Sequence, residues 1–302
     1  MFNSLRYHYE LEKDRLSTLT TPQGEYRYDY DEQGRIVRRT APNEEVVSYG
    51  YDGFLPVSVS WSGSIQGTIN TRYNNHLIVR QRCINQANCI TFSYDDDQLL
   101  TGAGALSLVR SADSGQISAT TLSVGGDEIG TRYDYNDYGE LIKGTASHRG
   151  TELYQVDYSR DVLGRISSKR ETLAGTTTRY EYVYDTVGRL TEVKTDDVTS
   201  HRYGYDSNGN RTHRDGTLVG SYDAQDRLTR YGVTDYRYTG NGELLSKTDT
   251  ASSETTRYRY DVMGNLRGVT LPDKRIDYII DGQDRRIGKR VDGTLVQGLL
   301  YQ

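Results

Sequence analysis

Stretches with tyrosine at every second position alternate with short polar turns along the whole chain. In the pattern Arg-Tyr-x-Tyr-Asp, two tyrosines two residues apart lie on one face of an extended strand, as for Tyr28 with Tyr30. After each turn, segments such as residues 189–193 (Arg-Leu-Thr-Glu-Val) resume an extended pattern. β-Branched segments such as residues 176–178 then lead into the next aromatic strand. This alternation predicts an all-β fold of short strands joined by tight turns.

The polar turn has a mechanical explanation, which residues 30–36 (Tyr-Asp-Glu-Gln-Gly-Arg-Ile) illustrate. Asp31 opens the turn, where its side chain can accept hydrogen bonds from backbone amides two or three residues on. Gly34, at the fourth position of a type I turn, takes the left-handed conformation of a G1 bulge. Each such turn therefore closes a β-hairpin, and the repeating unit is about twenty residues long.

The motif recurs as an internal repeat of about a dozen copies. Residues 184–190 and 260–266 match residues 30–36, and residues 161–166 keep every position after the aromatic one. The motif is least regular over residues 99–130. The residues that define the repeat, all expected to be structural, are Tyr30, Asp31, Gly34, Arg35, Tyr51, Asp52, Asp161, Gly164, Arg165, Tyr184, Asp185, Gly188, Arg189, Tyr205, Asp206, Gly209, Tyr260, Asp261 and Gly264.

A single hairpin is marginally stable in water, so the repeats must be stabilised by stacking on one another. We expect tyrosine over tyrosine and leucine over leucine from one repeat to the next, in a sheet that twists and coils. The prediction is one continuous array over residues 1–302, with no separate catalytic domain. It forms a curved, spiralling antiparallel sheet, a partial β-shell or barrel with open ends that need caps or partners.

Composition supports a thin sheet. The chain has 27 Tyr against 3 Phe and 1 Trp, and only 34% hydrophobic residues, which is low for a domain with one thick apolar core. The formal net charge of −5 argues against a nucleic-acid-binding face and against a polybasic membrane anchor. No apolar stretch approaches the roughly 20 residues of a membrane span, and residues 1–14 contain no signal-peptide core.

The two cysteines, Cys83 and Cys89, flank a short polar loop. They form a small disulfide if the protein is extracellular, or two free thiols otherwise. A zinc site would need two further ligands, and the only histidine close in sequence is His76.

Candidate chemistry is scattered rather than clustered. The histidines, at positions 8, 76, 148, 201 and 213, fall in different repeats without metal-ligand spacing, and no nucleophile elbow, Walker loop or zincin motif occurs. The run Asp95–Asp97 fits a solvated turn. The pairs Asp223/Asp226 and Asp281/Asp284 occupy the Asp and Gly places of the repeat. We therefore expect no catalytic, cofactor-binding or metal-binding residues, and no enzyme.

The Tyr-Asp-x-x-Gly-Arg-Leu signature resembles the YD repeats of bacterial rearrangement-hotspot (Rhs) proteins, insecticidal toxin-complex subunits and animal teneurins. The resemblance covers Tyr7 to Gln302. Residues 277–302 are similar to the segment that this family places near the end of its shell, and residues 43–54 with 61–63 resemble the bacterial, teneurin-like branch.

The resemblance implies a hollow β-shell, which encloses a C-terminal toxin in bacterial members and supports cell-surface adhesion in teneurins. It implies a secreted or cell-surface parent, with the rest of the shell and a cargo domain as partners. No Asp-Pro dipeptide occurs, so the family's self-cleaving segment is expected to lie outside this chain. The alternative is a carbohydrate-binding or adhesive module that presents tyrosines to glycans. The bland composition of residues 99–130 favours the shell.

Overall fold

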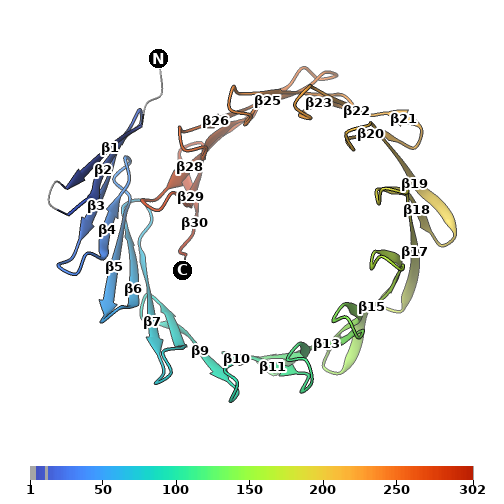
Figure 1. The fold of residues 1–302 in the computed structure, drawn as a ribbon, viewed down its shortest axis with the longest axis horizontal. Helices are drawn as coiled ribbons and strands as arrows, with labels where there is room; N and C mark the ends of the chain where they lie inside the picture. Colours follow the sequence, from blue (N-terminus) through green and yellow to red (C-terminus); the bar gives the residue numbers. More distant parts are fainter. Residues whose placement is uncertain (1–4, 11–12, 302) are drawn as a thin grey trace. The chain divides into compact units, whose positions relative to one another are not determined.

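The computed structural model describes residues 5–10 and 13–301, and these residues contain thirty β-strands and no helix (Figure 1). The all-β prediction is confirmed. The first nine strands are β1 (Arg6–Glu10), β2 (Arg15–Thr21), β3 (Gly24–Tyr30), β4 (Ile36–Thr40), β5 (Val46–Asp52), β6 (Leu55–Ser62), β7 (Gly67–Tyr73), β8 (Val79–Ile84) and β9 (Asn88–Tyr94).

The remaining strands follow at similar spacing. They are β10 (Leu100–Ala103), β11 (Leu106–Arg110), β12 (Ile117–Val124), β13 (Asp127–Tyr135), β14 (Leu141–His148), β15 (Thr151–Arg160), β16 (Ile166–Leu173), β17 (Thr176–Tyr184), β18 (Leu190–Thr195), β19 (Val198–Tyr205), β20 (Arg211–Arg214), β21 (Thr217–Leu218), β22 (Gly220–Tyr222), β23 (Leu228–Tyr231), β24 (Thr234–Tyr238), β25 (Leu244–Asp249), β26 (Thr255–Tyr260), β27 (Leu266–Thr270), β28 (Arg275–Ile280), β29 (Arg286–Val291) and β30 (Thr294–Gly298).

The strands belong to two antiparallel sheets, β1–β21 and β22–β30. Pairing runs between strands consecutive in the chain, as for β13 with β14 and β14 with β15. Within the described residues no pairing joins the first and last strands of either sheet, so both sheets are open, as predicted.

The chain divides into two compact units. The first, called unit 1, comprises residues 1–90 and 233–302, and the second, unit 2, comprises residues 91–232. In unit 2 the strands follow one another along a single curved layer (Figure 1). The continuity of one array over residues 1–302 remains a prediction.

Each motif turn produces a one-residue shift in strand register, as a G1 bulge requires. Tyr30 pairs with Ile36 after a shift at Asp29/Tyr30, and Tyr184 pairs with Leu190 after a shift at Val183/Tyr184. Gly34 has φ +85° and donates its N–H to the Asp31 carbonyl. The predicted type I turn with a left-handed glycine is therefore confirmed at this position.

The opposite ends of many hairpins are closed by a second kind of turn, which the sequence reasoning missed. Two residues with positive φ form it, for example Asp215–Gly216 and Asp292–Gly293. Such two-residue turns match the right-handed twist of the flanking strands. The sequence signal was present, because Asp-Gly dipeptides between extended segments indicate hairpins.

Burial differs between the units. Among the described residues of unit 2, Val156 is the only buried apolar side chain, as expected for a thin sheet. Unit 1 contains a true core, in which Val47, Trp61 and Ile69 pack against Ile279 and Ile287. Composition pointed to a thin sheet throughout, and the structure concentrates burial in one unit.

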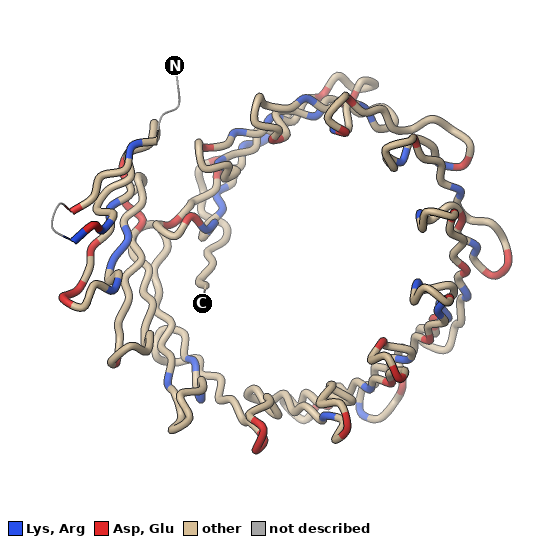
Figure 2. Tube along the Cα trace, in the orientation of Figure 1, with Lys and Arg blue, Asp and Glu red and all other residues tan. Residues whose placement is uncertain are grey.

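Opposite charges are interspersed along the trace (Figure 2). Several face each other across neighbouring strands, including Asp134 with Lys143 and Glu192 with Arg202. Such cross-strand pairs stabilise a polar sheet face modestly. No helix long and apolar enough to cross a bilayer occurs in the described part of the chain.

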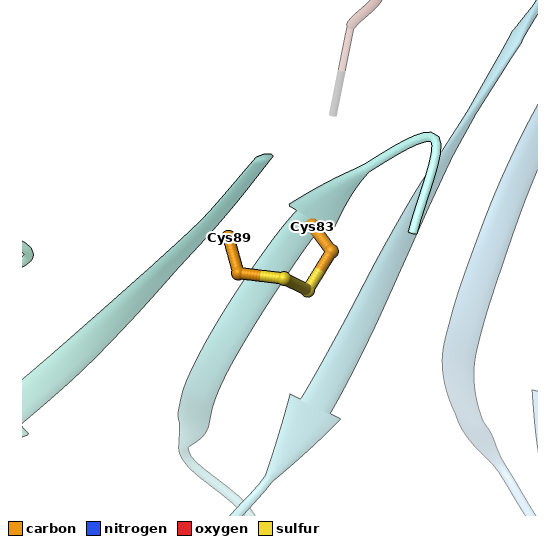
Figure 3. Close-up of a disulfide and its surroundings, with 2 residues drawn as sticks. All are labelled: Cys83 and Cys89. Carbon is orange, nitrogen blue, oxygen red and sulfur yellow. A yellow bond between two sulfur atoms is a disulfide. The ribbon is translucent and has the colours of Figure 1, made fainter. Parts of the chain in front are cut away.

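The two cysteines form a disulfide between β8 and β9 (Figure 3). Of the two states that the sequence left open, the structure contains the bonded one.

Candidate functional site: the repeat contacts and the closing seam

The motif aspartate organises each turn through both of its carboxylate oxygens. Asp161 Oδ1 accepts hydrogen bonds from the backbone N–H groups of Leu163 (2.9 Å) and Arg165 (3.0 Å), and Oδ2 accepts from Arg165 Nε (2.7 Å). The amides lie two and four residues on, rather than two or three as predicted. Asp185 makes the same three contacts with Val187 and Arg189. These hydrogen bonds therefore use the aspartate, the arginine and backbone N–H groups, and not the side chains of the two residues that follow the aspartate.

The first and fifth residues of the turn act as a matched pair whose identities vary. Asn136 takes the aspartate place, and its Nδ2 donates to Glu140 Oε2 at 2.8 Å. Elsewhere the pair is Asp206 with Asn210, whose Nδ2 donates to Asp206 Oδ2 at 3.1 Å. In these turns the pair joins one donor to one acceptor, and the charges can be exchanged or removed. At Asn74–Ile78 and Asp95–Leu99 the fifth residue is apolar, and its backbone N–H alone bonds to the first side chain.

Arginine and tyrosine connect one repeat to the next. The Arg35 guanidinium lies 4.6 Å from the centre of the Tyr51 ring, and the Tyr51 hydroxyl donates to the Ile36 carbonyl at 2.8 Å. Arg165 and Tyr184 repeat this arrangement at 4.5 Å, with the Tyr184 hydroxyl bonded to the Ile166 carbonyl. The recurring contact between repeats is therefore arginine on tyrosine, not the predicted tyrosine on tyrosine. Cation–π contacts of this kind contribute about 0.5–1 kcal/mol at exposed sites.

The repeat-defining residues thus fall into two groups. Aspartates and glycines shape the turns, with positive φ at Gly164, Gly188, Gly209 and Gly264, whereas tyrosines and arginines join neighbouring repeats. Asp52 departs from the pattern, because it pairs with Leu55 and leaves only Gly53 and Phe54 in the loop.

In unit 1 the last complete motif is buried against the first hairpins, a contact called here the seam. Asp281 is fully buried, and its Oδ2 accepts a hydrogen bond from Trp61 Nε1 at 3.2 Å, across 220 positions of sequence. The Arg285 guanidinium lies between two rings, 5.6 Å from Trp61 and 5.2 Å from Tyr301. Tyr301 also bonds through its hydroxyl to the Arg286 carbonyl, as the motif tyrosines do. The arginine and tyrosine contacts that join neighbouring repeats elsewhere are kept here, and Trp61, which is distant in sequence, joins them.

Apolar packing completes the seam. Figure 1 shows β5–β7 beside β28–β30, and the cluster Val47, Val59, Trp61, Ile65, Ile69, Ile279 and Ile287 lies between them, with Tyr49, Leu300 and Tyr301 against it. Gly288 allows the close approach, because a Cβ there would stand 2.8 Å from Ile279 Cδ1 and 3.2 Å from Ile65 Cδ1. Fully burying an aliphatic side chain contributes about 1.5–3 kcal/mol, so this cluster is the principal apolar contact of the unit.

A small cavity of about 120 Å³ lies beside the seam, lined by Tyr26, Arg39 and Asp284 among others. Burial raises the pKa of Tyr26 to about 12 and also raises the pKa of Asp284, where Asp261 and Asp281 add repulsion. Among the described residues no group of three or more His, Cys, Asp or Glu could hold a metal ion. The groups around this cavity connect the first hairpins of unit 1 to its last ones.

The sequence reasoning did not identify the seam. Its signals were the lone tryptophan at position 61 and the apolar run before Asp281, but periodicity alone gave no reason to connect them. The motif at residues 281–285 looks like any other repeat until its burial is known.

Comparison with known proteins places these features in a family. Residues 2–302 match the family model described as the Teneurin YD-shell. Teneurin-1 of Gallus gallus is 26% identical over 303 residues, covering 92% of this chain and 11% of the relative. Teneurin-4 of Homo sapiens is 33% identical over 138 residues, covering 37% of this chain and 5% of the relative. The chain thus spans about a tenth or less of the length of these relatives.

A solved structure shares the fold. The crystal structure of TcdB2-TccC3-Cdc42 superposes with a TM-score of 0.54 at 13% identity, covering 96% of this chain and 18% of that chain. With the match of the family model over nearly every residue, the chain belongs to the Teneurin YD-shell family.

Proposed function

We propose that this chain is a wall segment of a β-shell that encloses or carries a C-terminal polypeptide toxin. The family and the fold make the chain a structural shell scaffold. The passenger, the other parts of the shell as partners, and a secreted or cell-surface parent are parts of the proposal. No catalytic role is included in it.

The single observation that carries the proposal is the seam. A simple adhesive or spacer array needs contacts only between neighbouring repeats. Here Trp61 and Asp281, from opposite parts of the sequence, are bonded in the interior of unit 1. A wall that retains a passenger needs a contact between its early and late hairpins, because contacts between neighbouring repeats alone would leave it free to open.

The carbohydrate-binding alternative depended on free tyrosines, and the motif tyrosines are engaged. Tyr51 and Tyr184 each have a guanidinium on the ring and donate the hydroxyl to a backbone carbonyl. The ring faces of these two tyrosines are therefore occupied within the wall and cannot stack on a sugar, which favours the shell.

Limited proteolysis of the full-length parent tests the proposal. The segment encoded after Gln302 should resist a broad-specificity protease while the seam is intact. Ile287→Asp places a charge in a fully buried position and should open the seam. The passenger should then be digested before the repeats of unit 2.

Val198→Asp is the matched control, because Val198 is 69% exposed and the same substitution there should leave the seam intact. Immediate digestion of the passenger in the wild-type parent, with the repeats still folded, would reject enclosure. The repeats would then be a spacer.

A further inference from the structure

The turn between β8 and β9 is conformationally unfavourable on its own. Asn85 and Gln86 form it, with φ of +50° and +61°, and the Ala87 N–H bonds to the Ile84 carbonyl. The comparable turns at Arg149–Gly150, Ala174–Gly175 and Asp215–Gly216 have glycine as the second residue, and the turn at Asp196–Asp197 has aspartate, which with asparagine is the non-glycine residue that adopts this conformation most readily. Left-handed backbone is disfavoured for a residue with a long side chain such as Gln86. The Cys83–Cys89 disulfide spans this turn and links the two strands that flank it (Figure 3).

The closed turn positions Asn85 against β7. The Asn85 N–H donates to the Thr68 carbonyl at 2.8 Å, and the Thr68 N–H donates to Asn85 Oδ1 at 2.9 Å. The same carboxamide oxygen lies 3.2 Å from the place where a Cβ on Gly67 would stand. The turn therefore fixes the first residues of β7 through paired hydrogen bonds.

Those first residues of β7 also contact the C-terminal side of the seam. A Cβ on Gly67 would stand 2.6 Å from Leu300 Cδ1, so Leu300 lies directly over the Gly67 backbone. Leu300 packs in turn against the seam cluster that contains Trp61 and Ile287. A continuous line of contacts runs from the disulfide through Asn85 and Gly67 to Leu300.

The two sulfurs differ in access, which defines the reaction. Cys89 is exposed, whereas Cys83 is 8% exposed. A thiolate of a dithiol reductant can attack Cys89 Sγ, forming a mixed disulfide and releasing Cys83 as the thiolate. The second thiol of the reductant then attacks the mixed disulfide, releasing Cys89. The reductant leaves as its own disulfide, and two electrons have passed to the protein.

We propose that the Cys83–Cys89 disulfide is a redox latch for the seam. While the bond is oxidised, as in secreted proteins, the Asn85 turn holds the first residues of β7 in place, and with them the Gly67 backbone on which Leu300 packs. After reduction the strained turn relaxes, Asn85 leaves Thr68, and the contact of Leu300 with the seam loosens. Release of a passenger in a reducing compartment would be the consequence, and that consequence alone rests on the proposed function.

Trp61 is the only tryptophan and lies in the seam, so its fluorescence reports on the latch directly. The experiment compares acrylamide quenching of Trp61 and protease cleavage near Leu300 with and without dithiothreitol, counting free thiols in parallel. We expect both measures of opening to increase on reduction, cleavage by about tenfold. A Cys83→Ala, Cys89→Ala double variant should behave like the reduced protein without any reductant.

Gln86→Gly is the discriminating variant, because it removes the strain and leaves the disulfide. After reduction, its turn should stay closed and Trp61 should stay protected. The latch is overturned if Trp61 is unaffected when two thiols have formed, if dithiothreitol does not reduce the bond, or if Gln86→Gly opens as readily as wild type. These outcomes concern the seam alone, so the passenger-protection test on the parent can still succeed or fail separately.

Discussion

Replacing the motif aspartate by asparagine should have very different effects at two turns that share one sequence pattern. Asp161 and Asp281 both accept bonds from two backbone amides through Oδ1 and from an arginine through Oδ2. The side chain of Asp281 has no exposed surface, whereas that of Asp161 is 24% exposed. The substitution keeps Oδ1 and replaces Oδ2 by an N–H donor at both turns, which differ in burial and in the bond from Trp61 that accompanies it.

At position 281 the new amide would face three N–H donors. Trp61 Nε1, Arg285 Nε and Arg285 Nη2 all lie within 3.2 Å of Oδ2. Breaking a buried ion pair by removing one partner costs about 3–5 kcal/mol, and we expect Asp281→Asn to fall in that range. Asp161→Asn loses a pair that solvent screens, so its cost should be much smaller.

Urea unfolding followed by Trp61 fluorescence measures the first variant, and far-UV circular dichroism measures both. The double variant Asp161→Asn, Arg165→Glu reproduces the Asn136–Glu140 pair and should restore the turn, but not the contact of Arg165 with the Tyr184 ring. Costs that differ by less than about 1 kcal/mol between Asp281→Asn and Asp161→Asn would refute the argument, since burial would then not set the strength of the contact.

Three further outcomes are expected. Gly188→Ala should cost about 1–2 kcal/mol in thermal unfolding because φ there is +90°, whereas Gln98→Gly, at φ +65°, should be neutral or stabilising. Hydrogen bonds from the Arg165 side chain to Asp161 and from the Arg189 backbone to Asp185 hold each carboxyl pKa below 3.8, so the stabilisation is complete above that pH and is lost on further acidification. An Asp161→Asn, Asp185→Asn variant should therefore lose stability less steeply than wild type below pH 3.8 in a circular dichroism titration. Parallel curves for the two proteins would contradict the assignment. Burial raises the pKa of Asp284, so ionisation of this carboxyl destabilises the fold as pH rises. At pH 7, Asp284→Asn should unfold at a higher urea concentration than wild type, with a gain in unfolding free energy of less than about 1 kcal/mol. This gain should vanish in acid, where the wild-type carboxyl is protonated.

Much of the local fold could be read from the sequence because its causes are local. An aspartate, a glycine three residues later and alternating tyrosines specify a bulged hairpin wherever they occur, since the hydrogen bonds involved span at most four residues. The positions of Asp161, Gly164, Asp185 and Gly188 were predicted on this basis. The two-residue turns at the opposite ends were equally local, and their Asp-Gly signal was overlooked rather than absent.

The contacts between repeats were only partly accessible. Periodicity places tyrosine near the preceding repeat, but whether its ring meets another tyrosine or an arginine depends on the twist and offset of the strands. Arg35 over Tyr51 and Arg165 over Tyr184 are products of that geometry. The bonded state of Cys83 and Cys89 also required the paired strands to be seen.

The sequence by itself determined a family of bulged hairpins and the face on which their tyrosines lie. Tertiary structure alone decided which of a dozen similar motifs would be buried, completely at Asp281 and nearly so at Asp261. Asp281 and Asp161 have nearly the same neighbours in sequence, yet Trp61, 220 positions away, covers only the first. The reason is physical: turn chemistry acts over a few residues, whereas burial depends on which surfaces meet, and no repeat encodes its own distant partner.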